Sequence, residues 1–81
     1  MHTDPSTVSK AFIALLAEIA EIPEEKIHPE SALRADLDID SLAMVELFDA
    51  TETQWNIKIP DEEAQLLTTV GEIVDYLRQK T

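Results

Sequence analysis

The sequence predicts an all-α fold: a small four-helix bundle with three main helices, one short helix, and a long loop between helices one and two. In three separate stretches of the 81-residue chain, apolar residues recur at the spacing of an amphipathic helix. Capping residues or prolines mark where the helices begin. The sequence has no hairpin signal, internal repeat or low-complexity tract. Residues 1–81 are expected to form a single domain, because a chain of this length has no room for a second core.

The first helix is expected to begin after Asp4, which is a suitable N-cap, with Pro5 at the first helical position. It is expected to end near Ala20, ahead of Pro23. Its apolar stripe should face the core of the bundle. The stripe comprises Val8, Phe12, Leu15 and Ile19, widened by Ala11 and Leu16.

The next segment, Glu21 to Asp40, shows no sustained periodicity and is interrupted by Pro23 and Pro29. It is predicted to be a loop, with a short turn after Ser31. A loop of about twenty residues is unusual in so small a domain and usually carries function. Four apolar residues are expected to anchor it to the core: Ile22, Ile27, Leu33 and Leu37.

The second helix is predicted to run from Ser41 to about Trp55, with Asp40 as its N-cap. At about 100° per residue, its apolar residues and its acidic residues separate onto opposite sides. The predicted core face comprises Met44, Leu47, Phe48, Thr51 and Trp55. The predicted solvent face comprises Leu42, Val45, Glu46, Asp49 and Glu52. Two aliphatic side chains therefore stand among three carboxylates in solvent.

After this helix, residues 56–60 are expected to form a short extended connection with Ile57 and Ile59 on the same side. Pro60 and the acidic residues after it are typical of a helix start and predict a short third helix through about Leu67.

A fourth helix is predicted to start at Val70, because Thr69 and Glu72 have the spacing of a capping box. Its basic residues Arg78 and Lys80 suit the C-terminal end of a helix. Its core stripe is expected to be Val70, Ile73, Val74 and Leu77.

The composition excludes several classes of function. The net charge is −11, from six Lys and Arg against seventeen Asp and Glu, so nucleic acid and anionic membranes would be repelled. No apolar run approaches membrane-spanning length, and the first residues lack a signal-peptide pattern, which predicts a cytoplasmic protein without membrane insertion. Partners with basic patches are expected, and so charged a chain is expected to be a monomer. Because the chain has no cysteine, any thiol chemistry must be imported.

Ser41 is the central candidate for chemistry, and three interpretations compete. As a nucleophile it would need an adjacent base held by a third group. The two histidines are His2, near the terminus, and His28, in the loop, and Gly71 is the single glycine available for an oxyanion hole. We therefore expect no catalytic residue and no enzyme activity.

The aspartates before Ser41 suggest a metal site at first sight. Asp36, Asp38 and Asp40 match positions one, three and five of a calcium loop. Position six should be glycine but is Ser41, and position twelve should be glutamate but is Leu47. We therefore expect no structural metal site.

The remaining alternatives are an ordinary first-turn serine on a solvated acidic face, and a serine that is modified. Acidic helix starts are common, which favours the first alternative. Against it stand the exposed Leu42 and Val45 and the absence of any basic residue between Arg34 and Lys58. A phosphate ester on Ser41 would lie at a helix N-terminus, where backbone N–H groups favour an anion.

Two blocks of the sequence resemble the acyl carrier protein family, and the resemblance covers about Val8 to Leu77. Asp40-Ser41-Leu42 with the following Val45-Glu46-Leu47 is similar to the 4′-phosphopantetheine attachment segment of that family. The aspartate-rich run before the serine looks more like actinobacterial fatty-acid carriers, including those that serve very long chains. The second half is similar through Ile59-Pro60-Asp61-Glu62-Glu63-Ala64, Thr68-Thr69-Val70 and Asp75-Tyr76-Leu77.

The resemblance implies that Ser41 carries a 4′-phosphopantetheine arm, donated covalently from coenzyme A, whose thiol holds growing fatty acyl chains as thioesters. It implies partners with basic docking patches: a phosphopantetheinyl transferase, acyl transferases, ketosynthases, reductases and dehydratases. It implies an acyl pocket lined by Leu47, Trp55, Ile59, Ala64 and Leu67. The implied docking residues are Asp36, Asp38, Asp40, Leu42, Val45, Glu46, Asp49 and Glu52.

The chain departs from the family pattern at several positions, including Thr53 and Gln54, which dilute an acidic run that is often denser. Asp38 stands where many members have glycine, Thr51 where leucine is more usual, and Trp55 where phenylalanine is more usual. Two alternatives to a fatty-acid carrier remain open. One is a carrier of a polyketide, non-ribosomal peptide or other specialised pathway. The other is an acidic interaction module whose serine stays unmodified.

Overall fold

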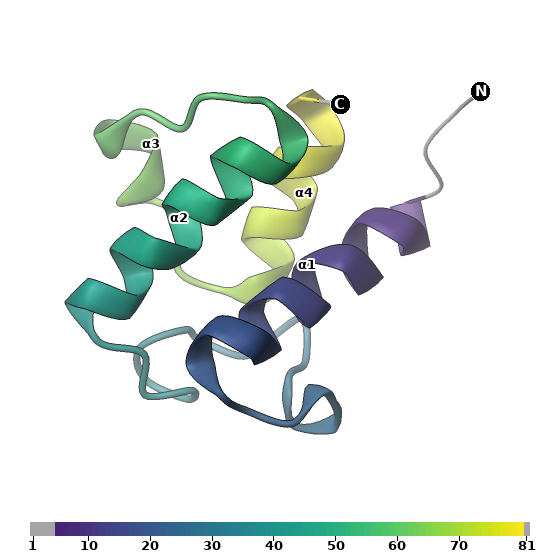
Figure 1. Cartoon of the computed structure of the whole chain (residues 1–81), viewed down its shortest axis with the longest axis vertical. Coiled ribbons are helices and arrows are strands. Elements are labelled where there is room, and N and C mark those ends of the chain that lie inside the picture. Colours follow the sequence, from purple (N-terminus) through teal and green to yellow (C-terminus); the bar gives the residue numbers. More distant parts are fainter. Residues whose placement is uncertain (1–4, 81) are drawn as a thin grey trace.

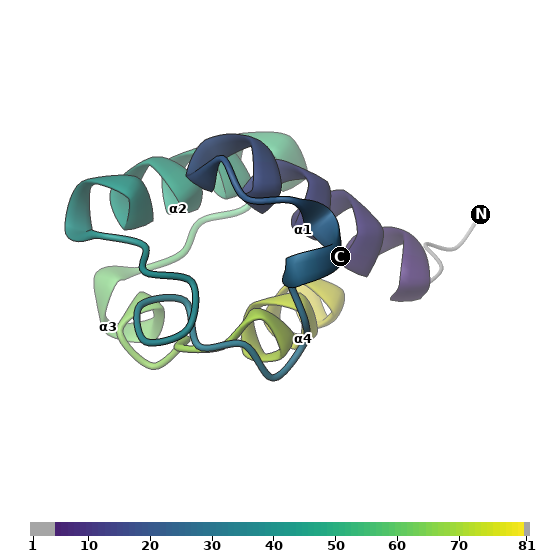
Figure 2. The same ribbon diagram turned by 90° about the horizontal axis from the view of Figure 1, so that it is seen from below.

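The protein is built from helices arranged in two layers. The computed structural model describes residues 5–80, so the predicted cap at Asp4 lies outside the described residues. Its elements are α1 (Pro5–Ala20), the 3₁₀ helix η1 (Glu24–Lys26), α2 (Ser41–Trp55), α3 (Asp61–Ala64) and α4 (Val70–Lys80) (Figure 1). Figure 2 shows α1 and α2 in one layer and α3 and α4 in the other. The predicted all-α fold, with three main helices and a short one, is confirmed.

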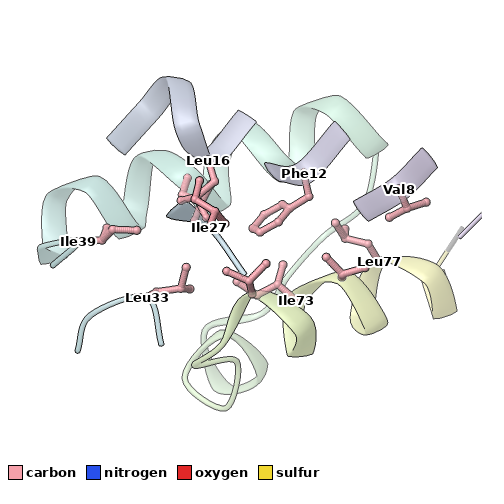
Figure 3. Packing of buried hydrophobic residues seen from close by; sticks show 11 residues of the cluster. Val8, Phe12, Leu16, Ile27, Leu33, Ile39, Ile73 and Leu77 are labelled. Atoms are coloured by element: carbon pink, nitrogen blue, oxygen red, sulfur yellow. The ribbon is translucent and has the colours of Figure 1, made fainter. Parts of the chain in front are cut away.

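The core lies between α1, α2 and α4. Figure 3 shows Val8, Phe12 and Leu16 of α1 on the side of that helix that faces α4, where Ile73 and Leu77 are buried. The apolar stripe of α1 faces the core as predicted, but the residue at its centre differs from the prediction. Leu16 is fully buried, whereas Leu15 and Ile19 are half-buried at the edge of the core. Ala11 is also half-buried. The predicted stripe of α4 is buried at all four positions, Val70, Ile73, Val74 and Leu77.

α2 begins and ends where its sequence predicts. The side chain of Asp40 accepts a hydrogen bond of 2.8 Å from the N–H of Ala43, which confirms the N-cap. Asn56 adopts the left-handed conformation, with φ of 54°, and ends the helix. On the predicted core face, Leu47 and Thr51 are fully buried. The other three residues of that face are half-buried and pack against the core: Met44, Phe48 and Trp55.

The long loop between α1 and α2 is more structured than the sequence suggests. The predicted turn after Ser31 is present at residues 33–36, where the Asp36 carboxylate accepts the N–H of Ala32 at 2.7 Å. Ile39 is a further anchor that the sequence analysis missed, with 4% of its surface exposed. The predicted anchors divide into buried Ile27 and Leu33 and half-buried Ile22 and Leu37.

The loop is also hydrogen-bonded to the start of α4. The backbone N–H of Val70 donates to Ser31 at 3.1 Å, and the N–H of Gly71 donates to Pro29 at 2.8 Å. These two carbonyls satisfy amides that a helix N-terminus leaves without an intrahelical partner. The main chain of the loop therefore caps α4 together with its capping box.

The second half of the chain differs from the prediction in one respect. α3 ends at Ala64 rather than near Leu67, and a turn takes residues 65–66 onward. The capping box of α4 is confirmed, because the Glu72 N–H donates to the Thr69 hydroxyl at 3.2 Å and the Thr69 N–H donates back to the Glu72 carboxylate at 3.1 Å. None of the helices within residues 5–80 is long and apolar enough to cross a membrane.

Candidate modification site and acyl groove

Ser41 is exposed at the first position of α2. Asp40 uses its side chain for the N–H of Ala43 and its main-chain carbonyl for the N–H of Met44, at 2.9 Å. Among residues 5–80, the N–H groups of Ser41 and Leu42 have no hydrogen-bond partner. The serine hydroxyl therefore stands beside two free amides at the positive end of the helix, a setting that favours an attached anion.

Just before Ser41, the backbone is anchored by the buried residue Ile39 and turns sharply at Asp38. Ile39 is buried, and its N–H donates to the carbonyl of Leu33 at 3.1 Å. Asp38 has a φ of 56°, in the left-handed region that glycine adopts most readily and that Asp and Asn tolerate. Glycine would adopt this conformation without steric cost. This conformation turns the chain so that Ile39 points inward while Ser41 reaches solvent.

A groove of about 880 Å³ begins at Ser41 and runs between α2, α3 and the turn at residues 32–35. Met44 and Phe48, from the half-buried edge of α2, line it on one side. Three predicted pocket residues line the opposite side, which we call the α3 wall (residues 59–67): Ile59, Ala64 and Leu67.

Two predicted pocket residues do not line this groove. Leu47 is fully buried in the core, and Trp55 is half-buried against it. The sequence analysis missed Met44 and Phe48, although it placed both on the core face. A helical wheel separates core-facing from solvent-facing residues. It does not show which core-facing residues line a groove and which pack against another helix.

The exposed side of α2 carries the predicted mixture of apolar and acidic side chains. Leu42 and Val45 have 71% and 57% of their surface exposed, and Glu46 and Asp49 are exposed beside them. We call these four residues the acidic face. The three loop aspartates, Asp36, Asp38 and Asp40, are exposed as well.

Glu52, predicted to lie with the acidic face, is only half exposed. Its carboxylate accepts a hydrogen bond from the N–H of Ile59 at 2.6 Å. The expectation of a freely solvated side chain was therefore wrong at this position, because the main chain after α2 folds back beneath it.

Charges of both signs line the groove, and the acidic ones are Asp49, Glu52 and Asp61. The one ion pair in the described part of the chain joins Asp75 and Arg78 of α4 at 3.4 Å, away from the groove. Arg34 and Lys58 are the basic residues that line the groove. Within residues 5–80, no group of three or more His, Asp or Glu side chains is arranged to hold a metal ion.

α3 is connected to α4 through the side chains of Glu63 and Tyr76. The Tyr76 hydroxyl is buried and has no well-formed hydrogen bond, but a weak hydrogen bond to Glu63, together with burial and the negative charge of that carboxylate, raises the pKa of the phenol to about 12. The hydroxyl therefore stays protonated at neutral pH.

Most of the chain matches a known protein family. Residues 10–77 match the protein family described as phosphopantetheine attachment site. The chain is 43% identical over 67 residues to an acyl carrier protein of Acidothermus cellulolyticus, which covers 83% of this chain and 80% of the relative. It is 42% identical over 78 residues to the meromycolate extension acyl carrier protein of Mycolicibacterium smegmatis, which covers 91% of this chain and 79% of the relative.

A third relative, from another organism, gives a similar result. The chain is 40% identical over 75 residues to an acyl carrier protein of Thermosynechococcus vestitus, with 93% of both chains covered. The family match spans most of the chain, from α1 to the last turns of α4. The chain therefore belongs to the acyl carrier protein family, whose members are carriers that bear 4′-phosphopantetheine and are not themselves enzymes.

Proposed function

We propose that Ser41 carries the 4′-phosphopantetheine arm and that the protein holds fatty acyl groups on it during fatty-acid synthesis. The observation that carries the proposal is the position of Ser41, which is exposed at the N-terminus of α2 and lines the groove. A single attachment point thus faces solvent, where enzymes act, and an apolar groove, where cargo can shelter.

The residues around Ser41 fit the phosphate end of the arm. The free N–H groups of Ser41 and Leu42 favour the phosphate, as does the dipole of the fifteen-residue helix α2. Asp38 and Asp40 repel it on the loop side and direct the arm away from the loop. When attached, the arm supplies the thiol that the cysteine-free chain lacks and on which acyl groups are held as thioesters.

The groove supplies shelter for the apolar part of the cargo. Ser41 and Glu52 both line it and are separated by three turns of α2, a rise of about 16 Å. Met44, Phe48 and Ile59 offer apolar surface along this length. Burial of an acyl chain there removes its methylene groups from water, which is favourable by about 0.8 kcal/mol for each group.

The acidic face of α2 is proposed to dock onto the enzymes that load and process the cargo. Leu42 and Val45 offer exposed apolar anchors, and Glu46 and Asp49 attract basic surfaces. The partners are a phosphopantetheinyl transferase and the acyl transferases, ketosynthases, reductases and dehydratases of fatty-acid synthesis. Because one relative is named a meromycolate extension acyl carrier protein, meromycolate chains are included among the candidate cargoes.

Intact-protein mass spectrometry after incubation with coenzyme A and a phosphopantetheinyl transferase tests the proposal. We expect the wild-type chain to gain the mass of one phosphopantetheine. Ser41→Ala should gain nothing, whereas the matched control Ser9→Ala, at a half-buried serine of α1, should gain it as the wild type does. A wild-type chain that stays unmodified would refute the proposal and favour an interaction module. The acyl groups found on the purified loaded protein then separate a fatty-acid carrier from a carrier of a specialised pathway.

A further inference from the structure

The hydrogen bond between Glu52 and Ile59 joins α2 to the chain that leads into α3. The two residues are seven positions apart, and the carboxylate oxygen Oε2 lies 2.6 Å from the backbone nitrogen of Ile59. Ile59 has 5% of its surface exposed, so its amide is turned away from bulk water. A hydrogen bond from a partly buried amide to a carboxylate is stronger than a neutral one, and leaving the amide unpaired is costly.

This hydrogen bond lies at the edge of the groove. Both Glu52 and Ile59 line it, at the end of the groove furthest along α2 from Ser41. Ile59 is followed by Pro60, which has no N–H and serves as the N-cap residue of α3. The bond therefore fixes the point at which the α3 wall begins.

The α3 wall is otherwise lightly held. α3 has only four residues, and within residues 5–80 the most extensive helix–helix contacts are those of α1 with α2 and with α4. Figure 1 shows α3 beside α2, at the margin of the bundle. At its far end, the chain is fixed where the Leu33 N–H donates to the Thr68 carbonyl at 2.9 Å. Glu63 meets Tyr76 of α4 between these two ends.

We propose that Glu52 is a positioning residue whose carboxylate latches the α3 wall to α2 and so determines how firmly the groove closes on an acyl chain. The cargo role in this statement rests on the proposed function. The latch also separates Glu52 from its acidic neighbours on α2. Its carboxylate is engaged within the protein, whereas Glu46 and Asp49 are exposed and available to partners.

Two conservative substitutions of Glu52 separate a latch from a docking charge. Glu52→Asp keeps the negative charge but is one methylene shorter, so its carboxylate cannot reach the Ile59 amide at the same backbone position. Glu52→Gln keeps the reach and an acceptor oxygen but removes the charge. Asp49→Asn is the matched control, because it removes one charge from an exposed residue that also lines the groove and has no part in the latch.

The first measurement is amide hydrogen exchange of the unloaded protein by NMR. We expect the Ile59 N–H to exchange about tenfold faster in Glu52→Asp than in the wild type, less than that in Glu52→Gln, and at the wild-type rate in Asp49→Asn. The amide of Ile73, which donates to Thr69 at 3.2 Å at the start of α4, lies outside the latch and should exchange at the wild-type rate in all variants. An Ile59 rate that is unaffected in Glu52→Asp, or that rises equally in Asp49→Asn, overturns the latch.

The second measurement uses the loaded protein and compares hydroxylamine cleavage of an octanoyl thioester with that of an acetyl thioester. We expect Glu52→Asp to accelerate cleavage of the octanoyl form several-fold and to leave the acetyl form unchanged, because only the longer chain reaches the wall. Glu52→Gln should resemble the wild type. Equal octanoyl rates in all variants overturn the cargo role. If the chain cannot be loaded, both the proposed function and the cargo role of Glu52 are refuted. Hydrogen exchange in the unloaded protein tests the Glu52–Ile59 latch independently of loading.

Discussion

The N–H of Gly71 donates a 2.8 Å hydrogen bond to the carbonyl of Pro29 and so joins the first turn of α4 to the loop that precedes α2. This approach is close because Gly71 has no side chain. A Cβ placed on it would stand 3.0 Å from the Pro29 oxygen. Through this junction, the loop that presents Ser41 is tied to the helix that carries four core residues.

We predict that Gly71→Ala lowers the free energy of unfolding by about 1 kcal/mol, even though alanine is the better helix former. The Pro29 carbonyl can retreat from the new Cβ only by stretching the hydrogen bond to residue 71, and that loss outweighs the gain in helix propensity. Urea unfolding followed by circular dichroism measures the change. A more stable Gly71→Ala protein would contradict the proposed close approach.

The left-handed conformation of Asp38 gives a second prediction. Asp38→Gly should be at least as stable as the wild type, because glycine adopts a φ of 56° without steric cost. Asp38→Val should lose about 1–2 kcal/mol, because a β-branched residue is strained there. Asp38→Asn, which tolerates this region, is the control for the loss of charge. Equal stability of Asp38→Val and the wild type would show that the turn before Ser41 is unstrained.

The capping box of α4 predicts a pH dependence of stability. Hydrogen bonds from the backbone N–H of Thr68, the Thr68 hydroxyl and the N–H of Thr69 lower the pKa of Glu72 below its usual range. Because the folded pKa lies below the unfolded one, this stabilisation is present above the unfolded pKa, near 4.5, and is lost as the pH falls through the folded pKa.

Glu72→Gln should therefore be less stable than the wild type at pH 7, and the difference should shrink as the pH falls below about 4. Thermal unfolding of both proteins at each pH measures the difference between them. Glu18→Gln, which neutralises an exposed acid of α1 that is in no ion pair, controls for the loss of a charge alone. A difference between wild type and Glu72→Gln that is constant with pH would rule out the cap as its source.

Docking through the acidic face predicts a salt-dependent effect on rate. Glu46→Lys should slow modification by the phosphopantetheinyl transferase, and the slowing should be greater at low ionic strength, where charges steer association most strongly. Glu18→Lys, at an exposed position on α1, is the matched reversal outside this face and should have less effect. If both reversals slow the reaction equally at every salt concentration, net charge rather than the acidic face governs recognition.

Much of the fold was predictable because its helix starts are encoded locally. Asp40 and the Thr69–Glu72 pair cap α2 and α4 as their spacing indicates. The shorter α3 and the burial of Leu16 in preference to Leu15 were not predictable, because they depend on which neighbour each helix face meets. Periodicity indicates that a face is apolar, but not which of its residues lies at the centre of the contact.

The site was predictable to a similar degree. The exposure of Leu42 and Val45 follows from the helical wheel of α2. The engagement of Glu52 by Ile59 does not, because it requires the chain after α2 to fold back, and no local pattern marks which amide it will present. The groove forms between three segments that are far apart in the sequence. The spacing of its lining residues along the chain therefore could not predict that they meet.

Identification of the modified residue tests the central claim most directly. Cleavage after Arg34 and Lys58 releases residues 35–58 as a single peptide in which Ser41 is the only serine. After incubation of the wild-type chain with coenzyme A and a phosphopantetheinyl transferase, tandem mass spectrometry of this peptide should locate one phosphopantetheine on Ser41. A peptide that remains unmodified, or an arm located on another residue of the chain, would contradict the account.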